Sequence, residues 1–160
     1  MIRIRAKAAG DQPWVEAVLK RLWGSREVAV HGQLFDAAAL PALIAGDRQG
    51  LRTGLLTYRV EPPRAEIVTL NALQPRQGIG SALIAALAAE LAARGVREIR
   101  LTMTNDNLDA LRFYQRRGFR VAAIRPGAVD AARHLKPAIP VVGNYGIARH
   151  DEVELVRVLG

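Results

Sequence analysis

The chain of 160 residues has no cysteine, few aromatic side chains and no long uncharged apolar run. Without cysteine it cannot form a disulfide, a thiolate metal site or a cysteine nucleophile. Its apolar runs are too short or too charged to span a bilayer, and the first ten residues lack the apolar core of a signal peptide. These absences predict a cytoplasmic protein that does not insert into a membrane.

Basic residues outnumber acidic residues by 23 to 15, which gives a formal net charge of +8. This excess favours a polyanionic partner, which could be nucleic acid, acidic lipid or a phosphorylated cofactor. A codon usage rich in alanine and arginine would also produce it. Because only 5% of the residues are aromatic and the arginines are scattered, the composition argues against a dedicated nucleic-acid surface.

The length fits one domain, residues 1–160, with a core of its own. Asp11 is expected to cap the first helix, and Trp14 and Trp23 are expected in the core. Residues 24–40 are expected to be irregular, with a short helix near 35–40. Hydrophobic periodicity and turn residues predict strands at 2–6, 42–45, 51–60, 64–73, 98–103, 119–124 and 152–159, and helices at 11–23, 78–94 and 108–117.

The order of these elements defines the expected topology. The strands at 64–73 and 98–103 are joined by a helix, so they must be parallel neighbours with a right-handed crossover. The other connections favour antiparallel pairing. The predicted fold class is therefore α+β, with a mixed sheet and a parallel β-α-β unit at its centre.

A glycine turn opens the helix of this unit, in the stretch QPRQGIGSAL that begins at Gln74. The unpaired N–H groups of a first helical turn bind anions, and Gly78 and Gly80 would let a phosphate approach the backbone. Arg76 could add a side-chain cation. A dinucleotide fingerprint would need glycine at Leu83, and a P-loop would need lysine after Gly80. A turn with packing glycines only is the alternative interpretation.

Two further stretches carry a resemblance to a known family. Residues 65–68 read Ala-Glu-Ile-Val, and the second helix fits the pattern N-x-x-A-x-x-F-Y-x-x-x-G-F, with Asn107, Ala110, Phe113, Tyr114, Gly118 and Phe119. With the glycine turn and the element order, the chain resembles a GCN5-related N-acetyltransferase (GNAT). The resemblance implies a twisted, mostly antiparallel sheet of about seven strands flanked by helices. Pro75 departs from the family's phosphate motif, which usually has Gln or Arg there.

The resemblance implies acetyl-CoA as the acyl donor and no metal. The glycine turn would hold the pyrophosphate, the edge of the fourth strand would bond the pantetheine arm, and the second helix would meet that arm from the other side. Asn107 would alternatively be a plain helix cap. The implied cofactor-binding residues are Leu70, Leu73, Arg76, Gln77, Gly78, Ile79, Gly80, Ser81, Asn107 and Tyr114.

Two residues are candidates for the proton transfers that amide formation requires. Glu66 would take the proton of the attacking amine, directly or through water, and Tyr114 would protonate the departing thiolate. The alternative for Glu66 is a strand carboxylate paired with Arg64 or another arginine, and for Tyr114 an aromatic core residue. His31 is expected to have a structural role.

The acceptor is expected to be a small-molecule or peptide amine, and the resemblance allows for a homodimer. Residues 125–150 are expected to be an ordered excursion, with a short helix at 129–135, that walls the acceptor pocket. Tyr145, His134 and His150 are the candidate acceptor contacts. An N-acetyltransferase is the first functional interpretation, ahead of a non-catalytic acyl-CoA sensor and a basic nucleic-acid-binding domain.

Overall fold

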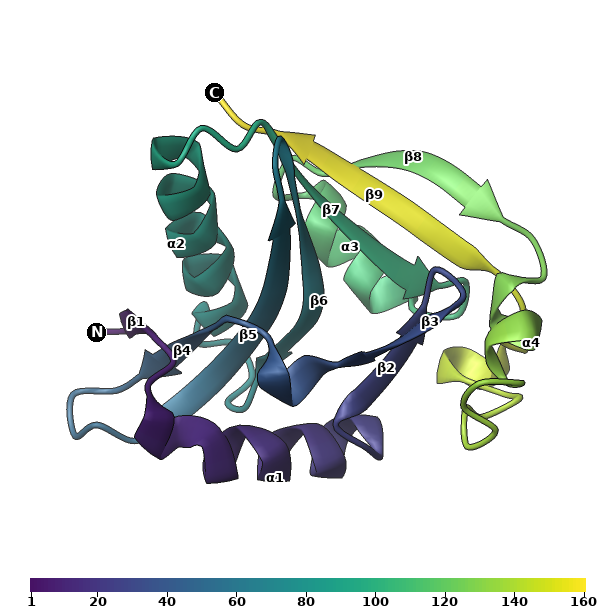
Figure 1. Ribbon diagram of the computed structural model, residues 1–160, viewed down its shortest axis with the longest axis horizontal. Coiled ribbons are helices and arrows are strands. Elements are labelled where there is room, and N and C mark those ends of the chain that lie inside the picture. The colour runs from purple at the N-terminus through teal and green to yellow at the C-terminus, as the bar shows by residue number, and fades with distance from the viewer.

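Seven strands form one mixed sheet in the computed structural model, which describes residues 1–160 (Figure 1). They are β1 Arg3–Ala6, β4 Ala42–Gly46, β5 Arg52–Glu61, β6 Arg64–Ala72, β7 Glu98–Thr104, β8 Arg120–Arg125 and β9 Glu152–Val158. Their spatial order is β1-β4-β5-β6-β7-β9-β8, and only β6 and β7 are parallel. The predicted α+β class, with a mixed and mostly antiparallel sheet, is confirmed.

Helices cover both faces of this sheet: α1 Gln12–Trp23, α2 Ile79–Ala93, α3 Leu108–Gln115 and the short α4 Ala128–Ala132. The larger core cluster, with 19 buried residues, lies between the sheet and the helices α2 and α3. The smaller cluster, with eight buried residues, lies under α1 on the other face, against β4 and β5. Figure 1 shows α1 along the lower side of the molecule and α2 at the opposite side of the sheet.

Gly54 on β5 determines how closely the beginning of α2 approaches the sheet. A Cβ atom at this position would lie 2.5 Å from Cγ2 of Ile79, the first residue of α2. Because a real Cβ cannot come so close to a packed methyl group, any other residue would push α2 outward. The glycine therefore fixes the position of the helix N-terminus over β5 and β6.

Residues 24–40 contain a hairpin, so the expectation of an irregular segment is wrong, whereas the short helix expected near 35–40 is present as a 3-10 helix at Ala37–Ala39. The hairpin consists of β2 Glu27–Val30 and β3 Gln33–Asp36, which pair with each other outside the main sheet. Between them His31 and Gly32 have φ angles of 55° and 69°, as a two-residue type I′ turn requires. Strands of four residues with polar ends give too weak an alternation to be recognised from sequence.

Asp11 occupies the N-cap position of α1, as predicted, but its side chain makes no capping hydrogen bond to that helix. Its buried carboxylate accepts hydrogen bonds from Arg5 (2.6 and 2.8 Å) and from Nε of Arg52 (2.9 Å). These bonds, with that from Arg5 foremost, hold the pKa of Asp11 far below its usual range. The carboxylate thereby joins β1 and β5 to the start of α1, which is a tertiary role that local sequence does not reveal.

The two tryptophans lie at the margin of the core, and not inside it as predicted. Trp23 is 37% exposed, and its indole N–H donates to Oδ1 of Asn71 at 2.8 Å. Trp14 packs against the smaller cluster, with the guanidinium of Arg52 5.5 Å from its ring centroid. The buried residues of α1 are Val15, Val18 and Leu19, and Trp14 packs at the edge of the cluster that they form.

The segment between β8 and β9 is ordered, and one buried carboxylate anchors it. Asp106 accepts hydrogen bonds from the backbone N–H of Asn144 (2.8 Å) and from Nε of Arg149 (3.0 Å). At the far side of the segment, Nζ of Lys136 donates to the carbonyl of Glu27 on β2 at 2.8 Å. The excursion thus connects the start of α3 with the β2–β3 hairpin.

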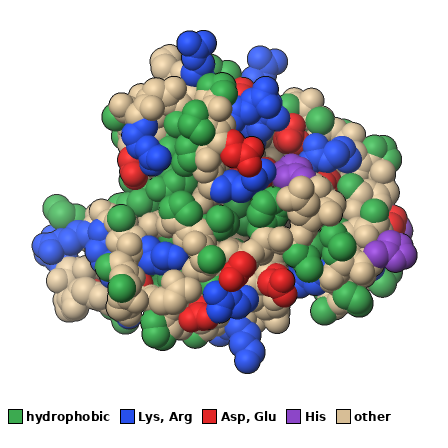
Figure 2. All heavy atoms as spheres, in the orientation of Figure 1, with side chains coloured by type: hydrophobic (Ala, Val, Ile, Leu, Met, Phe, Trp, Pro, Cys, Tyr) green, Lys and Arg blue, Asp and Glu red, His purple; other side chains and the backbone are tan.

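Charges of both signs are interspersed on the face seen in Figure 2, where neither sign forms a continuous stripe. A cationic stripe is the usual electrostatic footprint of a nucleic-acid interface, and this face lacks one. None of the helices is long and apolar enough to cross a membrane.

Candidate functional site

The strands β6 and β7 separate part-way along their length. They pair only from Arg64 to Ile67 on β6 and from Glu98 to Leu101 on β7. Beyond Ile67, β6 stays paired with β5 as far as Ala72, so its edge toward β7 is open. A bulge lies at the point of separation, because Ile67 and Thr69 oppose consecutive residues of β5 and leave Val68 without a counterpart.

The open edge exposes the backbone of Leu70 and Ala72. The N–H of Leu73 donates to the carbonyl of Thr53 on β5 at 2.8 Å, and backbone groups alternate direction along an antiparallel strand. The N–H and C=O groups of Leu70 and Ala72 therefore face the opening. Leu73, predicted to contact the cofactor, uses its N–H in the sheet and turns its side chain toward the smaller core.

A cavity of about 470 Å³ follows this open edge toward α2 and α3. We refer to it as the large cavity. It brings together eight of the ten predicted cofactor-binding residues; Leu73 and Asn107 are outside it. The large cavity is lined by Leu70, Ala72, Gln74, Arg76, Gln77, Gly78, Ile79, Gly80, Ser81, Asp109, Ala110, Phe113, Tyr114 and Arg117.

The beginning of α2 offers this cavity a run of unpaired backbone donors. None of the N–H groups of Gln74 and of residues 76–81 has a hydrogen-bond partner in the protein; Pro75 has no N–H, and the first helical bond is donated by Ala82. Gly78, at φ 74°, provides the left-handed entry to the helix. Several N–H groups aimed at one place, with the positive end of the helix dipole, form an anion-binding site.

Two arginines beside these donors carry positive charge that no acidic side chain of the protein neutralises. Arg76 lies in the turn itself, and Arg117 comes from the chain just after α3. The Arg117 guanidinium stacks 3.6 Å from the centroid of the Phe113 ring and donates from Nε to Oγ of Ser81 at 2.8 Å. Arg117 was not identified from the sequence, because its contact with Ser81 joins residues 36 positions apart.

Gly80 has a packing neighbour that the glycine spacing does not reveal. A Cβ atom here would lie 2.9 Å from Cζ of Phe113 on α3, whereas a Cβ at Gly78 would meet nothing within 4 Å. Gly80 therefore lets α2 and α3 approach each other, and Gly78 provides a backbone conformation. The two glycines of the turn have different physical roles.

Asn107 and Tyr114 occupy opposite ends of α3. Oδ1 of Asn107 accepts from the N–H of Ala110 at 3.2 Å, so its visible role is the helix cap. Tyr114 lines the large cavity and is buried among aromatic rings, with edge contacts to Phe113 and Phe119. Burial raises the pKa of the Tyr114 hydroxyl, which keeps its proton at physiological pH and remains a hydrogen-bond donor.

Glu66 lies on the opposite face of β6, in a second hollow of about 210 Å³ that we call the charged pocket. Its carboxylate is buried and accepts hydrogen bonds from Nε2 of His31 (2.5 Å) and Nε of Arg59 (3.1 Å). Arg64 pairs with Glu98 instead. The charged pocket is lined by His31, Arg59, Glu61, Arg64, Ala65, Glu66, Arg100 and Glu154.

The pairing changes the proton affinities of both partners. Burial alone would raise the pKa of Glu66, but the bonds from His31 and Arg59 outweigh it and hold this pKa below its usual value. The hydrogen bond to Glu66 raises the pKa of His31. The predicted structural role of His31 is therefore incomplete, because its ring shares the pocket with the candidate base.

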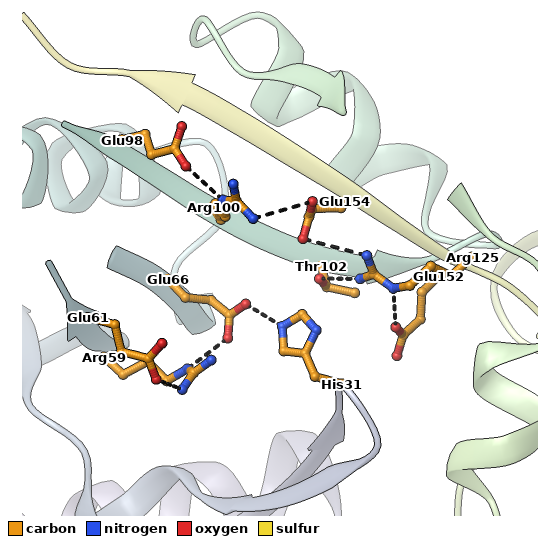
Figure 3. Close-up of polar contacts among 10 residues, drawn as sticks. All are labelled: His31, Arg59, Glu61, Glu66, Glu98, Arg100, Thr102, Arg125, Glu152 and Glu154. Carbon is orange, nitrogen blue, oxygen red and sulfur yellow. Dashed lines mark hydrogen bonds and ion pairs between the residues drawn. The ribbon is translucent and has the colours of Figure 1, made fainter. Parts of the chain in front are cut away.

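The charged pocket belongs to a wider polar layer on this half of the sheet (Figure 3). Arg100 on β7 bonds Glu98 at 2.9 Å. On β8, Arg125 bonds Glu152 (3.2 Å) and Oγ1 of Thr102 (3.1 Å). Helix α1 covers the other half of the face with apolar side chains. A polar or charged ligand is favoured here, because an apolar one would remove these groups from water without replacing their hydrogen bonds.

The three acceptor contacts predicted between β8 and β9 are not in the charged pocket. The hydroxyl of Tyr145 donates to Oδ1 of Asp109 at 2.5 Å, beside the large cavity. The ring of His150 bonds Asp130 at 3.0 Å. The exposed His134 makes no side-chain hydrogen bond or ion pair, and no group of three acidic or histidine side chains is arranged to hold a metal.

Comparison with known proteins identifies the family of this chain. The model of the acetyltransferase (GNAT) family matches residues 34–119, from β3 to the residue after α3 and its turn. The chain belongs to this family. An uncharacterised Bacillus subtilis protein, YdhI, is 36% identical over 137 residues, which cover 86% of each chain.

Solved GNAT structures share the fold. An Elizabethkingia anophelis GNAT acetyltransferase with acetyl-CoA bound has a TM-score of 0.71 at 18% identity and covers 99% of this chain and 98% of its own. A Bacillus subtilis acetyltransferase in complex with CoA has a TM-score of 0.70 at 17% identity, with both chains fully covered. The predicted family resemblance is confirmed. His31 and the segment from 126 to 151 lie outside the residues that the family model matches.

Proposed function

We propose that this GNAT protein is an N-acetyltransferase that moves the acetyl group of acetyl-CoA to an amine by direct attack in a ternary complex. The observation that carries the proposal is the separation of β6 from β7 after Ile67 and Leu101. On one side of β6 the opening meets the large cavity, and on the other side Glu66 faces the charged pocket. A donor and an acceptor can thus meet at one strand.

The large cavity fits the donor. The free N–H groups from Gln74 to Ser81 would bind the pyrophosphate, and Arg76 and Arg117 would add charge for a polyanionic cofactor. The pantetheine amides would bond the exposed N–H and C=O groups of Leu70 and Ala72, as an added strand does. A backbone N–H at the bulge would stabilise the oxygen of the tetrahedral intermediate.

The charged pocket fits a polar amine, which its carboxylates, with the buried Glu66 among them, would attract as the ammonium ion. An alkylammonium has a pKa near about 10, so it must lose a proton before it attacks. In this proposal the proton leaves through the paired Glu66 and His31. The hydroxyl of Tyr114 supplies a hydrogen bond, and then a proton, to the thiolate as the carbon–sulfur bond breaks.

The test combines binding with turnover. Calorimetry should show CoA binding to the folded protein, and a panel of primary amines should release free thiol from acetyl-CoA in proportion to the acetylated amine found by mass spectrometry. CoA binding without turnover of any amine would instead favour an acyl-CoA sensor. No CoA binding, with salt-sensitive binding to DNA, would favour the nucleic-acid alternative. Cytoplasmic location and homodimer formation stay predictions.

A further inference from the structure

The β2–β3 hairpin delivers a histidine to the carboxylate of Glu66. His31 occupies the first of the two turn positions, where its φ of 55° is required by the type I′ turn. From this turn the imidazole reaches across the polar face of the sheet, and its Nε2 lies 2.5 Å from Oε2 of Glu66. The two residues are 35 positions apart, so the hairpin serves to bring them together.

Glu66 is poorly suited to accept a proton from an ammonium ion by itself. Its Oε2 already accepts from His31 and its Oε1 from Nε of Arg59. A carboxylate that is hydrogen-bonded on both oxygens is stabilised in the charged form, so its proton affinity is low. An imidazole that donates one N–H to a carboxylate is the better base, because the carboxylate stabilises the imidazolium that forms.

The second ring nitrogen of His31 is available for this purpose. When Nε2 carries the hydrogen donated to Glu66, Nδ1 holds a lone pair, and it has no hydrogen-bond partner in the protein. Figure 3 shows the ring between Glu66 and the side chains of Arg125 and Glu152, from the strands beyond the opening. The charged groups that face the ring are thus Glu66, Arg59, Arg125 and Glu152.

We propose that Nδ1 of His31 is the proton acceptor for the amine. Glu66 is then a positioning residue that orients the imidazole ring and stabilises its protonated form. This inference rests on the proposed acetyltransferase function. His31 takes one proton from the ammonium, and the neutral nitrogen attacks the thioester carbon. As the carbon–sulfur bond breaks, the hydroxyl of Tyr114 gives its proton to the sulfur, and the second proton of the nitrogen returns through water to the Tyr114 oxygen. The products are the amide, CoA thiol and a protonated His31.

The substitutions that test this proposal should leave the fold intact. His31→Asn creates Asn-Gly, the dipeptide that type I′ turns prefer, so the hairpin is retained while the base is removed. Glu66→Gln keeps a hydrogen-bonding side chain but removes the charge. Gln33→Asn is the matched control, because it changes an exposed side chain of the same hairpin. Each is assayed by thiol release with the primary amine that the wild-type chain turns over fastest.

The pH profile of kcat/KM separates the two roles. In the wild type its acidic limb should coincide with the titration of the His31 ring followed by NMR, above the ordinary histidine value of about 6.5. Glu66→Gln should move both the limb and the NMR titration to lower pH by about 1 to 3 units, because an attractive charge is lost. His31→Asn should lower kcat/KM near neutral pH by about 10²- to 10⁴-fold, with partial recovery as the amine deprotonates in solution.

Three results would overturn the inference. The first is a His31→Asn profile equal to that of Gln33→Asn. The second is an acidic limb of the kcat/KM profile that disappears in Glu66→Gln but remains in His31→Asn, which would make Glu66 itself the base. The third is a wild-type chain that binds acetyl-CoA yet acetylates no amine, which would overturn the proposed function as well. The first two leave the proposed function intact.

Discussion

Replacing Gly80 by alanine should destabilise the protein through the ring of Phe113. The new Cβ would lie 2.9 Å from Cζ of that ring, whereas carbon atoms in contact prefer about 3.5–4.0 Å. The ring cannot retreat freely, because the guanidinium of Arg117 stacks on it at 3.6 Å. Overpacking lowers the free energy of unfolding by about 1–3 kcal/mol. Because Cζ is at the far end of a side chain that can shift slightly, we expect a loss of about 1–2 kcal/mol for Gly80→Ala.

The second variant in this prediction is Phe113→Leu, which removes the atom in the way. On its own it should cost about 1–2 kcal/mol, since the ring is only partly buried. In its presence Gly80→Ala should be neutral or stabilising by up to about 1 kcal/mol, because alanine is the better helix former. The two changes should therefore be coupled by about 2 kcal/mol, within the range known for residues in contact.

Urea unfolding of the four proteins of this cycle measures the coupling, provided that the denaturant slopes agree. Gly78→Ala is the matched control. Its Cβ meets nothing within 4 Å, but the residue sits at φ 74°, so its cost of about 1–2 kcal/mol is backbone strain. Phe113→Leu should not relieve that strain. Additive costs for Gly80→Ala and Phe113→Leu would refute the packing argument. CoA affinity, measured by calorimetry, should fall in Gly80→Ala and recover in the double variant.

Two further predictions concern single side chains. Tyr114→Phe should lower kcat for thiol release by about 10²-fold and leave the CoA affinity nearly unchanged. This is the low end for a positioned acid, because a thiolate leaves readily. If the variant only melts at a lower temperature, Tyr114 is a core residue and not an acid. Asp11→Asn should cost about 2 kcal/mol at pH 7. Since folding lowers the pKa of Asp11, its contribution is present above the unfolded value of about 3.9 and fades as pH falls below it. Urea midpoints of the two proteins should therefore converge toward pH 3, and a constant gap would contradict the argument.

Elements whose signals are local were predictable from the sequence. The helix from 79 to 93 has leucines at helical spacing and a glycine at each end, and the structure has it within one residue of the predicted bounds. The donors at its N-terminus follow from helix geometry, so the anion site could be inferred without any tertiary contact. The cap at Asn107 follows in the same way from the order of polar and apolar residues.

Features that depend on distant partners were not predictable. Arg117 bonds Ser81 from 36 positions away, and His31 bonds Glu66 from 35 away. Arginine is common throughout the chain and His31 is one of three histidines, so nothing in the local sequence identifies the partner of either side chain. Leu73 was predicted at the cofactor because the family resemblance places the strand edge near Leu70 to Leu73 beside the pantetheine arm. The resemblance does not give the direction of each backbone group, and the N–H of Leu73 bonds Thr53.

The bulge at Val68 explains why the large cavity and the charged pocket lie on opposite faces of one strand. Before it, Ala65 and Ile67 face the larger core and Glu66 faces the charged pocket. A regular strand would put Leu70 on the same face as Glu66, because side chains alternate with period two. The extra residue reverses this alternation, so Leu70 packs toward the larger core and lines the large cavity. The separation of the two sites is thus a consequence of one inserted position, and the sequence marks it, because the consecutive apolar residues Ile67 and Val68 interrupt the alternation of residues 65–70.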